Sequence, residues 1–204
     1  MLFERNGSRP TIDPAAHVAA SASLVGAVTI GPGCYVDHNV VVESSGPSVT
    51  LDNDVVVFAG SVVRSLGGSS RPASPVTIGA GSLIAPQCTL SGCRIGSNCY
   101  VATGVIVLQG AVVGDGCRLG VGAIVHAGTL LPELARVGMR HVAVPDGDGF
   151  VSTADIERAR ELLASADFFD RAFATSEADQ AALHRDVIGK LLAEVRGWED
   201  RAVT

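Results

Sequence analysis

The sequence predicts an all-β fold, a parallel β-helix of hexapeptide repeats, followed by C-terminal α-helices. Aliphatic residues recur every six positions from Ile12 to Val137, and glycine, asparagine or aspartate stands between them where the chain must turn. Aromatic residues make up only 4% of the chain, which suits a repeat better than a globule packed by large side chains. We expect the β-helix over residues 1–145 and a helical segment over residues 146–204.

The repeat itself predicts short strands and tight corners. A fixed six-residue period is typical of a β-helix in which three hexads, about 18 residues, form one coil. Units such as Ile30-Gly31-Pro32-Gly33 and Val113-Gly114-Asp115-Gly116 place glycine or aspartate at the corner, where few other residues adopt the required backbone. The repeating aliphatic positions are Ile12, Val18, Leu24, Ile30, Val36, Val42, Leu51, Val57, Val63, Ile78, Ile84, Leu90, Ile95, Val101, Val107, Val113, Leu119, Val125, Leu131 and Val137.

The cysteines occupy a second repeating position. All five stand two residues before a repeat aliphatic, where a small side chain should point into the coil: Cys34, Cys88, Cys93, Cys99 and Cys117. An odd number of cysteines without a secretory signal favours reduced thiols. The N-terminus has no basic region followed by an apolar core, so we expect a cytoplasmic protein.

The charge pattern argues against two kinds of partner. The formal net charge is −6, and no run of Lys or Arg provides an electrostatic footprint for nucleic acid or an anionic membrane surface. No apolar run is long enough to cross a bilayer. We therefore expect neither a nucleic-acid nor a membrane partner.

Two interruptions of the rhythm, over residues 43–50 and 64–77, predict protruding loops, which either carry a ligand site or are solvated excursions. A third irregularity is the five-residue step from Leu90 to Ile95. The open ends of a β-helix need capping or oligomer formation.

After Pro145 the apolar spacing becomes helical. The residues 152–155 are a candidate cap for a first helix whose apolar stripe is Ile156, Ala159, Leu163, Ala166 and Phe173. The residues 176–179 are a candidate cap for a second helix with the stripe Leu183, Val187, Leu191, Val195 and Trp198. Each helix should pack on the β-helix or on a neighbouring subunit.

From about residue 10 to residue 145 the chain resembles the γ-class carbonic anhydrase-like branch of the hexapeptide-repeat superfamily. The segments 12–19 and 90–96, the latter reading Leu-Ser-Gly-Cys-Arg-Ile-Gly, carry the resemblance. It implies a left-handed coil and a homotrimer that holds a metal ion between subunits through three histidines. Arg64, Pro86 and Ser91 stand at the three histidine positions, and none is a good zinc ligand. We therefore expect no metal site and no carbonic anhydrase activity.

One outward column follows from the register of the coils. The residues that follow the third aliphatic of each coil should stack about 4.8 Å apart: Glu43, Arg64, Ser91, Leu108 and His126. Glu43 and Arg64 are then expected to form an ion pair. In a trimer of the kind that the resemblance implies, this column lines the cleft between subunits.

Three functions stay open at this point, and whether the chain is an enzyme stays open with them. In the first, the cleft binds or transforms a small anionic metabolite without a cofactor, with Arg64 as anchor and Gln87 or Ser91 orienting it; Arg64, Glu43 and Ser91 would otherwise seal a subunit interface. In the second, the chain is an acyl-CoA-dependent acyltransferase with His126 or His38 as base. In the third, it is a non-catalytic scaffold trimer.

Overall fold

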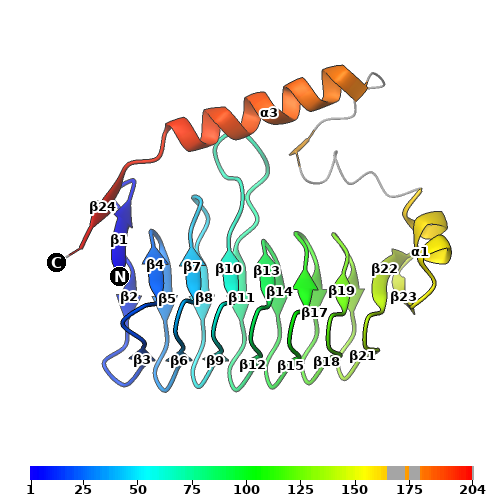
Figure 1. The fold of residues 1–204 in the computed structure, drawn as a ribbon, viewed down its shortest axis with the longest axis horizontal. Helices are drawn as coiled ribbons and strands as arrows, with labels where there is room; N and C mark the ends of the chain where they lie inside the picture. Colours follow the sequence, from blue (N-terminus) through cyan, green and yellow to red (C-terminus); the bar gives the residue numbers. More distant parts are fainter. Residues whose placement is uncertain (165–172, 175–179, 204) are drawn as a thin grey trace.

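The computed structural model describes residues 1–164, 173–174 and 180–203, and its main body is a left-handed parallel β-helix (Figure 1). Three sheets run along the coil and meet at three corners. The predicted fold class is confirmed. Sheet A contains β1 (Leu2–Arg5), β4 (Ser23–Val25), β7 (Val41–Glu43), β10 (Val62–Arg64), β13 (Thr89–Ser91), β16 (Ile106–Val107), β19 (Ile124–Val125) and β22 (Val142–Asp146), with β23 (Gly149–Thr153) and β24 (Asp200–Ala202) antiparallel at its ends.

The other two sheets contain seven parallel strands each. Sheet B contains β2 (Thr11–Ile12), β5 (Val28–Ile30), β8 (Val49–Leu51), β11 (Val76–Ile78), β14 (Arg94–Ile95), β17 (Val112–Val113) and β20 (Leu130–Leu131). Sheet C contains β3 (His17–Val18), β6 (Tyr35–Val36), β9 (Val56–Val57), β12 (Leu83–Ile84), β15 (Tyr100–Val101), β18 (Arg118–Leu119) and β21 (Arg136–Val137).

The core is the inside of the coil, and it is made of the repeat aliphatics. Leu24, Leu51 and Ile78 are fully buried there. The five cysteines are buried beside them as free thiols, as the sequence predicted. Burial raises the pKa of Cys93 to about 12, so this thiol stays protonated at neutral pH.

Glycine has two separate roles at the corners. Gly33 and Gly81 have φ angles of 71° and 69°, the left-handed conformation predicted for the turn. Gly79 and Gly114 directly follow the repeat aliphatic residue and allow neighbouring coils to pack closely. A Cβ added at either one would stand 2.6 Å from the backbone of the next coil. From the sequence, both kinds of glycine were expected only to allow the chain to turn.

Both interruptions of the repeat leave the coil as loops. The first loop leaves sheet A after Glu43 and rejoins the coil in sheet B at Val49, and the second leaves sheet A after Arg64 and rejoins the coil in sheet B at Val76. The second loop is held as an arm by a β-bridge between Leu66 and Ser74. Figure 1 shows this arm reaching up to the C-terminal helix.

The C-terminal segment closes both ends of the coil. β23 and α1 (Ile156–Leu163) cover the end of the coil at β22. Asp155 caps α1 and lies within the predicted cap region, residues 152–155. α1 ends at Leu163, before Phe173, and Ala166 of the predicted stripe lies outside the described residues. β24 pairs with β1 at the other end.

The second predicted helix is α3 (Gln180–Arg196). Its predicted cap lies outside the described residues, and Trp198 lies beyond its end rather than on its stripe. The sequence did not predict β23 or β24. Within the described part of the chain, no helix combines the length and apolarity that a membrane span requires.

Candidate functional site

The predicted outward column exists on sheet A. Glu43, Arg64 and Ser91 are direct neighbours in register across β7, β10 and β13. The Nε and Nη2 atoms of Arg64 donate to Oε2 of Glu43 at 3.2 and 2.9 Å, which confirms the predicted ion pair. Arg64 keeps 45% of its side chain exposed, whereas Glu43 keeps 10%.

A second arginine, which the sequence did not single out, completes this cluster. Arg5 donates from Nη1 to Oε1 of Glu43 at 2.5 Å, and from Nε and Nη2 to the two oxygens of Asp200 at 2.6 and 2.7 Å. Its guanidinium carbon lies 4.0 Å from the ring centroid of Trp198. Arg5 could not be found from sequence because its partners lie 38 and 195 residues away.

The charges of this cluster balance. Burial alone would raise the pKa of Glu43, but hydrogen bonds from Arg5 and Arg64 outweigh it and hold that pKa below its usual range. The ion pair with Arg5 likewise lowers the pKa of Asp200. Two arginines therefore face two ionised carboxylates, which weakens the electrostatic case for an anion anchored by Arg64.

The remaining sequence candidates lie apart from Arg64. Gln87 is an exposed corner residue with a φ of 60°, at the opposite end of β13 from Ser91. His126 lies three coils beyond Arg64, or about 14 Å along the column. The structure thus brings Glu43, Arg64 and Ser91 together, but neither Gln87 nor His126 joins them within one chain.

Arg64, Pro86 and Ser91, the positions that the resemblance aligns with histidines, carry side chains that are poor zinc ligands. Over residues 1–164, 173–174 and 180–203, no group of three or more His, Cys, Asp or Glu side chains is arranged to hold a metal ion.

His126 lies beside an apolar ridge. The outward residues of sheet A are half-buried and mostly aliphatic, in register from coil to coil: Val41, Val62, Thr89, Ile106, Ile124 and Val142. His126 follows β19 and is itself half-buried, with its Nδ1 atom out of contact with solvent. The ridge and the imidazole therefore share one face of the coil.

A polar groove lies at the same corner of the coil. It has a volume of about 300 Å³ and is lined by Ser74, Gln109, Gly110 and Gly128. The backbone N–H of Gly128, two residues after His126, donates to the carbonyl of Gln109 at 3.1 Å. Gln109, one coil before His126, supplies a side-chain amide to this groove, and Ser74, from the arm after β10, supplies a hydroxyl.

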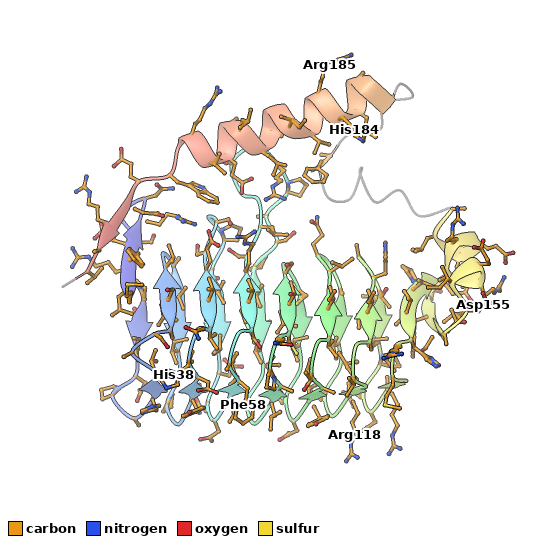
Figure 2. The ribbon with its side chains drawn as sticks, in the orientation of Figure 1. His38, Phe58, Arg118, Asp155, His184 and Arg185 are labelled. Atoms are coloured by element: carbon orange, nitrogen blue, oxygen red, sulfur yellow. The ribbon has the colours of Figure 1, made fainter. Side chains whose placement is uncertain are left out.

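His38, the other candidate base, is exposed at a corner between sheets C and A (Figure 2). Its Nδ1 atom lies 2.8 Å from Oγ of Ser21. The carboxylate of Asp37 accepts the backbone N–H of His38 at 2.7 Å and that of Ala59 at 3.2 Å, rather than the imidazole. Within the described part of the chain, the imidazole of His38 thus contacts a hydroxyl rather than the carboxylate that a catalytic pair would require.

A larger cleft opens between the two loops and α3. Its volume is about 500 Å³, and Ser45, Gly67, Gly68, Glu194 and Trp198 are among its walls. Glu194 in this wall is held in place by Arg71, whose Nε and Nη2 atoms bind its buried carboxylate at 2.7 and 3.2 Å. The interrupted repeat indicated the loops, but the helical wall comes from residues more than a hundred positions away.

No protein-family model matches the chain, and no curated protein matches it either. Solved structures do match. The UDP-N-acetylglucosamine O-acyltransferase LpxA of Moraxella catarrhalis is 14% identical, with a TM-score of 0.50, covering 96% of this chain and 98% of that one. A hexapeptide transferase family protein of Anaplasma phagocytophilum is 19% identical, with a TM-score of 0.47 and coverages of 91% and 93%.

A third match is PerB of Caulobacter crescentus, solved in complex with CoA and GDP-perosamine. It is 21% identical, with a TM-score of 0.47, covering 71% of this chain and 56% of that one. At 14% identity the likeness to the LpxA structure shows the fold alone, the parallel β-helix. The resemblance to the γ-class carbonic anhydrase-like branch stays a prediction.

Proposed function

We propose that the chain is an acyltransferase that moves an acyl group from coenzyme A to a small acceptor, with His126 as general base. The observation that carries this proposal is the half-buried imidazole beside an apolar ridge and two residues from Gly128, which lines a polar groove. The part of the ridge next to His126, Ile124 and Val142, suits an acyl chain or pantetheine arm, and the groove suits a polar acceptor. The fold shared with an acyltransferase supports the same reaction class.

In this reaction the amine or hydroxyl of the acceptor attacks the thioester carbonyl. A carbon–nitrogen or carbon–oxygen bond forms, and the carbon–sulfur bond breaks. His126 takes the proton from the acceptor and returns it to the departing thiolate, so that free coenzyme A leaves as a thiol. A positioned base of this kind contributes roughly 10²–10⁴-fold to the rate.

The proposal includes a homotrimer. The aliphatic ridge of sheet A leaves apolar side chains half-exposed in one chain, which is typical of a surface that another subunit covers. A neighbouring subunit packed on the part of the ridge from Val41 to Ile106 would leave the part beside His126 open and turn the nearby groove into a cleft. Replacement of Ile106 by Glu should then yield monomers in light scattering, whereas an unchanged oligomer would exclude this interface.

The test of acyl transfer compares two histidine variants. Acetyl-CoA is offered with a panel of small amines and alcohols, and released coenzyme A is measured together with acetyl-CoA binding by calorimetry. His126→Gln should lose about 10²-fold or more of kcat and still bind acetyl-CoA, whereas the exposed His38→Gln should behave like wild type. Absence of acetyl-CoA binding by the wild type, or full activity of His126→Gln, would reject the proposal.

A second candidate is a metabolite-binding protein that uses the cleft between the loops and α3. The cleft volume of about 500 Å³ favours it, because small-molecule sites fall in this range. Melting temperatures with a panel of small metabolites, for wild type and Trp198→Ala, test whether a ligand binds in this cleft, because Trp198 forms part of its wall. A ligand-induced stabilisation that is lost in Trp198→Ala supports the site, and equal melting shifts in both proteins exclude it.

A further inference from the structure

Two arginines stand side by side on the outer face of sheet C. Arg118 in β18 and Arg136 in β21 are direct partners in the strand register, and both are exposed. Adjacent strands lie about 4.8 Å apart, so the two guanidinium groups can converge on one anion. Figure 2 shows Arg118 pointing from the coil into solvent.

This pair differs from the balanced cluster at Arg5. Among the ion pairs formed by the described residues, none includes Arg118 or Arg136. The nearest acid before Arg118, Asp115, accepts the backbone N–H of Ser97 at 2.8 Å. Like charges directly opposite each other on neighbouring strands are destabilising, so the folded chain gains from an anion bound between them.

The neighbours of the pair suit a ligand with a ring as well as a charge. Tyr100 in β15 is the register partner of Arg118 and keeps 49% of its surface exposed. Its strand, β15, lies about 7 Å from the midpoint between β18 and β21, which is one and a half strand spacings. Arg140 and Met139, at the corner after β21, add a third cation and an apolar side chain.

We propose that this face of β15, β18 and β21 binds a nucleoside diphosphate. Arg118 and Arg136 hold the phosphates, since a guanidinium binds phosphate oxygens through two parallel hydrogen bonds, and Tyr100 carries the base by stacking. The site is separate from His126, which lies on sheet A. It does not depend on acyl transfer, because it can be tested with ADP alone.

The probes are ADP, inorganic pyrophosphate and adenosine, titrated by calorimetry into the full chain at low ionic strength. ADP should bind more tightly than pyrophosphate, adenosine should bind least, and added salt should weaken the binding of ADP. Arg118→Gln and Arg136→Gln should each raise the Kd of ADP about tenfold, as expected for loss of one charge-assisted contact. Tyr100→Ala should weaken the binding of ADP and leave the binding of pyrophosphate unchanged.

The matched control is Arg94→Gln. Arg94 is also an exposed outward arginine, but its register partners on sheet B are the uncharged Thr77 and Val112. Its substitution changes the net charge equally and should leave the Kd of ADP as in wild type. An equal loss of affinity in Arg94→Gln, or no ADP binding by the wild type at millimolar concentration, would overturn the proposal. The melting temperature of each variant without ligand verifies that it is folded.

Discussion

Arg5, in β1, and Asp200, in β24, form a bidentate ion pair, with Nε–Oδ1 and Nη2–Oδ2 distances of 2.6 and 2.7 Å. The pair joins the two ends of the chain, where β24 covers the edge of β1. Through Arg5 it also joins Glu43 and Arg64, so β24, β1, β7 and β10 share one charge cluster. Substitutions in this cluster should therefore affect the end of the coil as a unit.

Glu43→Gln should lower the free energy of unfolding by about 3 kcal/mol at pH 7, the lower end of the cost of breaking a buried ion pair, because Arg5 still retains Asp200. The side chain of Arg5 is only 7% exposed and cannot regain the lost contact from water. Chemical denaturation measures the change. Arg64→Gln is the control, with an expected cost of about 1 kcal/mol or less, since Arg64 is half-exposed. Equal costs for the two variants would contradict the assigned burial.

The same cluster predicts a pH dependence with a definite sign. The folded-state pKa of Glu43 lies below its ordinary value of 4.5, so the carboxylate contributes its full stabilisation above pH 4.5. That contribution declines as the pH falls through the depressed folded pKa. The difference in melting temperature between wild type and Glu43→Gln should thus be constant near neutrality and shrink in acid. A difference that persists unchanged in strong acid would show that the ionised carboxylate is not its source.

Glu194→Gln should loosen α3 and the arm 65–75 without unfolding the coil. The side chains of Arg71 and Glu194 are 7% and 2% exposed, and Figure 1 shows α3 above the arm rather than against the strands. Local opening of such an element costs less than global unfolding. Hydrogen exchange should rise in α3 and the arm while sheets A, B and C stay protected. Glu199→Gln, in an exposed pair with Arg201, is the matched control and should change nothing.

Gly114→Ala should destabilise the coil, because its Cβ would stand 2.6 Å from the backbone nitrogen of Glu133 in the next coil. Overpacking of this kind typically costs about 1–3 kcal/mol. Gly189→Ala, within α3, meets nothing within 4 Å and should be neutral or stabilising by up to about 1 kcal/mol. Thermal unfolding of both variants tests the pair, and a stable Gly114→Ala would contradict the stacking role of this glycine.

Much of the coil could be predicted from the sequence because its contacts repeat. Each inward aliphatic contacts the same position one coil away, so the period alone places Leu51 beside Ile78 and Glu43 beside Arg64. The candidate site was predicted less completely. Gln87 and Arg64 shared one hypothetical cleft in sequence, but they occupy different corners of the coil.

The sequence by itself determined the six-residue period, the inward cysteines, the two loops and the Glu43–Arg64 pair, since each depends on spacing within one or two coils. Tertiary structure alone decided that Arg5 and Asp200 neutralise this pair, that Arg71 holds Glu194, and that the C-terminal strand covers β1. These contacts join residues 38 to 195 positions apart. No local period encodes such pairs, because their positions depend on how the non-repeating tail folds back across the finished coil.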